Sequence, residues 1–272
     1  MPDFKDQLTR LEQANRRAVE LSSVIEKYAT TNPASFCAAI SEDRLHWEMK
    51  LVVASSPPTD EWGLIFGEVV NHLRSVLENL VVAIARQSGI TDPKDIKRLA
   101  FPIAATEAEW QVQENRIEKL PSSYRDAIRN VQPFLRLAQG MKTDGDLLLM
   151  LRDLSNEDKH HLFVKPQFSM TELQNMCSVE FASEDEAFEN VPPQVTIFNP
   201  EFANGALVWR QDCKTKIVKV SGAGKIGMQI QVVLPGGKVL GLTECLGMLN
   251  YYTRVVFDFV TSGGVVVPKS GK

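Results

Sequence analysis

Apolar residues recur at helical spacing along much of the chain, and this pattern predicts its main helices. Three long stretches, residues 4–28, 60–86 and 243–261, each carry one continuous apolar face. The face of 60–86 is the widest, so this helix is expected to be the central and most buried one. Shorter helices are expected at 106–116 and 121–130, each beginning with a capping or proline signal.

Alternation of apolar and polar residues with period two predicts strands in two separate regions. Residues 35–54 read as a β-hairpin, with the turn at 41–43 and Leu45, Trp47, Met49 and Leu51 on the buried face. After Val164 the chain becomes β-rich, with short apolar stretches bounded by turn residues. Strands are expected at 177–181, 195–198, 206–210, 214–221 and 226–234. The acidic stretch 184–190 is expected to form an exposed loop.

The order of these elements favours an α+β fold, because helices and strands are segregated rather than alternating. We expect a mainly helical bundle over residues 1–163, with the hairpin at 35–54 inserted into it. Residues 164–272 are expected to form an antiparallel β-rich segment and a closing helix that packs on the bundle. Two placements of the hairpin stay open: it joins the later strands in one sheet, or it packs on the helical part alone.

The composition indicates an ordinary globular protein with no general electrostatic preference for nucleic acid. The chain has 272 residues, 44% of them hydrophobic and 24% charged, and a formal net charge of −4. A local basic groove is compatible with that charge. The four cysteines form no C-x-x-C pair, which favours reduced thiols in the cytoplasm over a zinc ribbon. No secretory signal and no apolar run of membrane-spanning length is recognisable, so no membrane partner is expected.

Familiar cofactor and metal motifs are missing or lack their context. Gly222, Gly224 and Gly227 match G-x-G-x-x-G, but a strand pattern follows where phosphate binding needs a helix N-terminus, which predicts a glycine-rich β-turn. His160 and His161 point about 100° apart on a helix, and His72 with Glu68 lacks a second ligand pair. We therefore expect neither a metal nor a cofactor.

The stretch 147–163 changes from an apolar helical run into a dense polar cluster at residues 152–161. If the helix continues through the cluster, Arg152, Asn156 and His160 lie four residues apart on one face. Such a stripe suits an active site, and it equally suits a structural network between helices. Both interpretations stay open at this point.

Three segments together resemble a known family: EVVNHLRSVLENL at 68–80, FPI at 101–103 and LSNEDKHH at 154–161. They look like a family of uncharacterised bacterial and phage proteins, which in turn resembles the HEPN superfamily of helical bundles. The resemblance implies a metal-independent endoribonuclease of a defence or toxin system that acts as a homodimer on RNA. Its motif is an Arg, a polar residue and a later His. Here these would be Arg152, Asp153 and His160, with seven residues between Arg152 and His160.

The cluster has a chemical role under either interpretation. In a ribonuclease, His160 would serve as base or acid, Arg152 and Lys159 would bind phosphate, and Asn156 would orient them. In a structural network, the cluster would instead lock onto the central helix. That network would join Asp158, Lys159 and His160 to the polar residues Glu68, Asn71, His72, Arg74 and Glu78.

Three functional hypotheses follow. The first is a HEPN-like ribonuclease. The second is a non-enzymatic binding or scaffold protein in which the cluster is structural and the β-rich part recognises a partner. The third is small-ligand sensing, which would require a pocket inside the β-rich part.

Overall fold

The computed structural model describes residues 4–160, 166–234 and 236–264, and it confirms the α+β class. Contacts divide the chain into two compact units, each built from separate stretches of sequence. The helical unit comprises residues 1–22, 59–166 and 232–272, and the β unit comprises 23–58 and 167–231. The sequence predicted two consecutive parts that meet at residue 163. The contacts divide the chain differently, because the early hairpin pairs with a strand from the second half of the chain.

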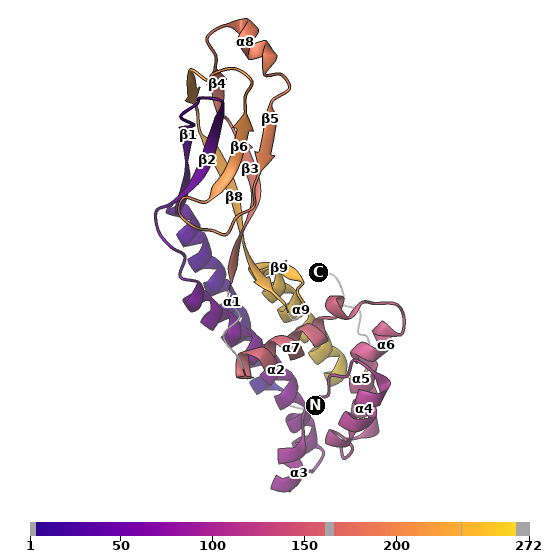
Figure 1. Cartoon of the computed structure of the whole chain (residues 1–272). Coiled ribbons are helices and arrows are strands. Elements are labelled where there is room, and N and C mark those ends of the chain that lie inside the picture. Colours follow the sequence, from indigo (N-terminus) through magenta and orange to yellow (C-terminus); the bar gives the residue numbers. More distant parts are fainter. Residues whose placement is uncertain (1–3, 161–165, 235, 265–272) are drawn as a thin grey trace, which may run out of the picture. The chain divides into compact units, whose positions relative to one another are not determined.

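Helix α2 (Thr59–Gln87) is the core of the helical unit, as its apolar pattern predicts. The apolar residues that recur at helical spacing from Trp62 to Ile84 are buried, whereas Leu64 is exposed. Three further helices pack around α2 (Figure 1): α1 (Lys5–Thr30), α7 (Leu147–His160) and α9 (Leu242–Thr261). The closing helix α9 thus packs on the bundle, and its own buried face extends from Leu242 to Val260.

Short helices connect α2 to α7. They are α3 (Pro93–Arg98), α4 (Glu107–Gln113), the 3₁₀ turn η1 (Glu114–Arg116), α5 (Ser122–Asn130), α6 (Pro133–Leu137) and the 3₁₀ turn η2 (Thr143–Gly145). The start of α4 confirms its predicted cap, since Thr106 Oγ1 accepts from the Glu109 N–H at 3.1 Å. Helices α3 and α6 span only one or two turns, which is too short for a periodic pattern to show in the sequence.

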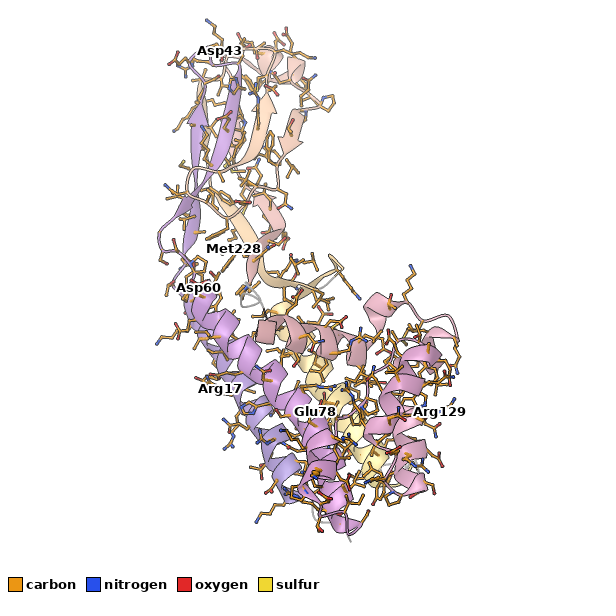
Figure 2. The ribbon with its side chains drawn as sticks, turned by 60° about the horizontal axis from the view of Figure 1, so that its bottom comes forward. Arg17, Asp43, Asp60, Glu78, Arg129 and Met228 are labelled. Carbon is orange, nitrogen blue, oxygen red and sulfur yellow. The ribbon has the colours of Figure 1, made fainter. Side chains whose placement is uncertain are left out.

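The β unit contains the predicted hairpin, β1 (Ala34–Ile40) with β2 (His46–Val53), in one sheet with later strands. The order in that sheet is β1-β2-β6-β5, where β6 is Leu207–Asp212 and β5 is Gln194–Ile197. In Figure 2, Asp43 marks the tip of the hairpin. Of the two placements left open by the sequence, the hairpin therefore takes the one beside the later strands. Trp47, Met49 and Leu51 are buried as expected, and Val208 and Ile217 complete the core.

The remaining strands form smaller antiparallel pairings. Strand β3 (Gln167–Asn175) pairs with β8 (Gly224–Val233), β4 (Ser178–Glu180) pairs with β7 (Lys219–Ser221), and β9 (Val239–Gly241) lies beside β8 in the sheet order. The sequence did not predict β3 or β9, and β7 is shorter than the expected strand 214–221.

Two local predictions are wrong. Residues 184–190 were expected to be a loop, but Glu184–Glu189 form helix α8, because Ser183 caps the helix by accepting from the Glu186 N–H. Acidic residues in the first turn of α8 also interact favourably with the helix dipole. Leu45 was expected on the buried face of the hairpin, but it lies in the turn before β2 and is exposed.

The glycine motif forms the expected turn. Strand β8 begins at Gly224, so no helix follows the motif. Gly222 has φ +124°, and a Cβ placed on it would lie 2.4 Å from the backbone oxygen of Met176. Glycine is therefore required there by close backbone packing rather than by a phosphate.

Candidate functional site

Helix α7, which carries the polar cluster, has a buried and fixed N-terminus. The carboxylate of Asp146 is fully buried and accepts from the backbone N–H groups of Leu148 at 3.0 Å and Leu149 at 3.1 Å. The Arg136 Nε also donates to this carboxylate, at 2.7 Å, and its guanidinium lies over the Tyr252 ring. Helix α7 is thus held in place by a cap that is itself charge-paired.

Helix α7 continues through His160, so the condition for a shared Arg152–Asn156–His160 face is met by the backbone. Asn156 is exposed, and it makes no side-chain hydrogen bond within the described part of the chain. The side chains of Asp158, Lys159 and His160 lie outside the described residues, as does the whole of His161. The predicted catalytic pairing of Arg152 with His160 therefore stays a prediction.

Arg152 contacts its neighbour on α7 and two groups at or before the start of α4. Its Nε donates to the neighbouring Asp153 carboxylate at 2.7 Å, and its Nη1 donates to the backbone oxygen of Ile103 at 3.4 Å. Nη1 also lies 3.6 Å from the Glu109 carboxylate, while the Arg152 side chain remains 29% exposed. Two carboxylates thus already neutralise the guanidinium that was expected to bind phosphate.

The Ile103 contact belongs to a larger arrangement around residues 101–105, which include the FPI motif and which we call the FPI segment. Phe101, Pro102, Ile103 and Ala104 are buried, and this segment has neither helical nor strand pairing. Buried backbone groups without partners destabilise a fold, so their hydrogen bonds must come from elsewhere.

Side chains supply nearly all of those bonds. Glu78 accepts from the Phe101 N–H at 2.8 Å, and Arg74 donates to the Phe101 oxygen at 2.9 Å. Gln113 accepts from the Ile103 N–H at 3.2 Å and donates to the oxygen of the same residue at 3.3 Å.

Gln132 binds the next part of the FPI segment. It accepts from the Ala104 N–H at 3.0 Å and donates to the Pro102 oxygen at 2.9 Å. At the end of the segment, Glu109 accepts from the Ala105 N–H at 2.8 Å, and the backbone N–H of Phe134 donates to the Ala104 oxygen at 3.1 Å. Side chains from α2, α4 and α7 therefore converge on one irregular segment.

Arg74 and Glu78 form an ion pair one helical turn apart on α2. Burial lowers the pKa of the Arg74 guanidinium, an effect that the Glu78 carboxylate opposes and that the nearby cations Arg116 and Arg152 reinforce. The Nη1 atom of Arg74 is buried, as is the hydroxyl of Ser155 on α7, and neither has a hydrogen-bond partner within the described residues. The Arg74–Glu78 pair thus supports the FPI segment.

Glu68, another α2 residue of the predicted network, pairs with helix α1. Glu68 accepts from Arg17 of α1, with Nε at 2.7 Å. Figure 2 labels Arg17 on α1 and Glu78 on α2 at separate places along the two helices. Asn71 of α2 is half-buried. Glu68 thus pairs with α1, whereas Arg74 and Glu78 bind the FPI segment, and the predicted network with residues 158–160 stays a prediction.

His72 lies in a groove between α1 and α2 with a volume of about 640 Å³. Two arginines of this groove, Arg10 and Arg86, make no hydrogen bond or ion pair within the described part of the chain, and one carboxylate, Asp6, lies with them. The groove is lined by Asp6, Gln7, Thr9, Arg10, Gln13, His72, Asn79, Val82, Ala83, Arg86 and Gln87. His72 thus lines this groove together with residues of α1.

Sequence reasoning missed Gln132, Gln113 and Glu109 as binders of the FPI segment. A capping-box pattern marks Glu109 as a residue at the start of a helix, but it does not indicate that Glu109 binds the FPI segment. Gln132 precedes a proline and lies at the end of an amphipathic helix, and nothing in that pattern marks it as a fully buried side chain.

Within the described residues, no three His, Cys, Asp or Glu side chains gather closely enough to hold a metal ion. Inside the β unit, a cavity between Leu51, Phe168 and Met228 has a volume of about 10 Å³. A cavity of this size holds about one water molecule, which does not support small-ligand sensing there.

Comparison of the chain with protein-family models, curated proteins and solved structures finds no match. In the part of the chain that the structure describes, none of the helices combines the length and hydrophobicity needed to cross a bilayer. Evidence for function comes from the geometry of the molecule itself.

Proposed function

We propose that this chain is a non-enzymatic binding protein, in which the helical unit is a rigid frame and the β unit recognises a partner. The observation that carries the proposal is that Arg152 already binds the carboxylates of Asp153 and Glu109 and the backbone oxygen of Ile103. A guanidinium that stabilises a phosphorane must face a space that the substrate enters, with donors free for its oxygens. Arg152 instead supports the FPI segment together with Arg74 and Glu78.

The setting inferred for this function is the cytoplasm. All four cysteines, Cys37, Cys177, Cys213 and Cys245, are free thiols, which is the usual state in a reducing compartment. The HEPN resemblance, with RNA as a substrate and a homodimer as the active form, stays an alternative prediction that one assay separates from the binding function.

The test compares RNA cleavage with stability in the same variants. Purified full-length chain is incubated with total RNA in EDTA, alongside Arg152→Ala and His160→Ala, and each protein is also unfolded in urea. The binding function predicts no cleavage by any of the three and a lower unfolding free energy for Arg152→Ala, by about 1–2 kcal/mol. Cleavage by the wild type that both substitutions abolish, with their folds intact, would establish the ribonuclease instead.

A further inference from the structure

Strand β5 and the helix before it carry a dense run of exposed apolar side chains. Phe188 is 74% exposed and Ile197 is 63% exposed, and Val191 and Val195 between them are exposed as well. Single exposed apolar residues are ordinary on a protein surface, whereas four within ten residues mark a surface that a partner covers.

The backbone of β5 is open on one side. In the order β1-β2-β6-β5 this strand is at the sheet edge, and among the described residues it pairs with β6 alone. The Phe198 N–H donates to the Val208 oxygen at 3.0 Å, so the peptide groups of Phe198 face β6. Because these groups alternate along an antiparallel strand, those of Thr196 also face β6, whereas those of Val195 and Ile197 point outward. Natural edge strands are commonly protected by charges or prolines within the strand, and the sequence QVTI has neither.

The side chains of β5 continue the apolar face of the sheet. Ile197 lies opposite Trp209, which in turn lies opposite the buried Met49. Residues directly opposite in a sheet share one face. The Trp209 Nε1 is buried without a hydrogen-bond partner in the described part of the chain. An added strand with alternating apolar residues would therefore extend this face beyond β5.

Charge indicates which kind of strand fits. Helix α8 lies at the N-terminal end of β5 (Figure 1), and its four carboxylates form no ion pair with a cation of the described residues. These acids are Glu184, Asp185, Glu186 and Glu189. A second copy pairing antiparallel through its own β5 would bring Glu201, another acid, toward that helix. A segment with Lys or Arg at that end is the complementary occupant.

Building on the proposed binding function, we infer that the open edge of β5 binds an extended segment of a partner protein. The segment adds as a fifth strand, with alternating β-branched or aromatic residues along β5 and basic residues beside α8. Main-chain hydrogen bonds at Val195 and Ile197 would hold it, and the acids of α8 would select its orientation.

Two labelled peptides test this inference on the full chain. Both carry alternating threonine and valine; one ends in two lysines and the other in two glutamates. We expect the lysine peptide to bind at least about tenfold more tightly in fluorescence anisotropy, and to protect the Val195 and Ile197 amides from hydrogen exchange. Binding that is equal for both peptides, protection of a different strand, or no binding at all would overturn the inference.

A matched pair of variants localises the effect. Ile197→Lys should weaken the lysine peptide at least about tenfold, whereas Val112→Lys, at a position of α4 that is 73% exposed, should leave binding unchanged. Circular dichroism confirms that both variants fold. If the wild type forms a dimer that Ile197→Lys disrupts, the occupant is a second copy and the partner segment is refuted. RNA cleavage would refute the proposed binding function, whereas peptide binding alone decides the role of β5.

Discussion

The carboxylate of Glu78 accepts a 2.8 Å hydrogen bond from the backbone N–H of Phe101, which lies 23 residues further along the chain. Arg74, one turn earlier on α2, donates to the oxygen of the same residue at 2.9 Å. Together the two side chains take the place of a neighbouring strand for a buried segment that has none. This ion pair therefore acts in tertiary packing, beyond its effect on the helix that carries it.

Replacing Glu78 by Gln should destabilise the helical unit by roughly 2–3 kcal/mol, because it leaves the largely buried Arg74 guanidinium without its counter-charge. Urea unfolding measures this change. Glu68→Gln on the same helix is the matched control: its partner Arg17 and the carboxylate are both more exposed, so the loss should stay below about 1 kcal/mol. Equal losses in the two variants would contradict the structural role of Glu78.

Gln132→Leu should cost about 3 kcal/mol or more of unfolding free energy. The side chain is fully buried and bonds to Pro102, Ala104 and Ile128, so leucine leaves three buried backbone groups unpaired. Gln113→Leu should cost about 1 kcal/mol, because Gln113 is half-buried and water can replace part of its bonding. Thermal and urea unfolding should rank the two variants in this order, and the opposite order would refute it.

Two glycines that flank strand β8, Gly222 before it and Gly236 after it, offer a test of close packing. Gly222→Ala should destabilise the β unit by about 2–3 kcal/mol, since its new Cβ would meet the Met176 oxygen at 2.4 Å in addition to a φ of +124°. Gly236 also has a positive φ, +90°, but no atom of the described residues outside its chain neighbours lies within 4 Å of an added Cβ. Gly236→Ala should lose only about 1 kcal/mol, and hydrogen exchange of the β8 amides would reveal the difference.

The buried thiol of Cys245 predicts a loss of stability at alkaline pH. Burial raises its pKa from the ordinary 9.0 to about 12. Above pH 9 the unfolded chain loses this proton while the folded chain retains it, so stability present below pH 9 is lost as the pH rises toward 12. In Cys245→Ala the slope of unfolding free energy between pH 9 and 11 should become shallower by up to about 1.4 kcal/mol per pH unit. Cys37→Ala, at an exposed thiol, should leave that slope unchanged.

Local sequence patterns were sufficient for the elements whose signals are local. The apolar stripe of α2, the helices α1 and α9 and the β1–β2 hairpin all follow from periodicity, because a helix or hairpin forms its hydrogen bonds within its own stretch. Helix α7 continues through His160, the condition that the sequence left open, and it places Arg152 and Asn156 on one face.

Contacts between distant stretches could not be read from those patterns. The sequence marks Arg74, Glu78 and Arg152 as polar residues in need of partners, yet nothing in it shows that the FPI segment supplies them. It equally does not show that Gln132 is fully buried or that β2 pairs with β6. Such partners lie tens to more than a hundred residues apart, and folding selects them by satisfying every buried backbone group at once. Periodicity thus determined which segments become helices and strands, whereas tertiary structure decided which polar side chains hold them together.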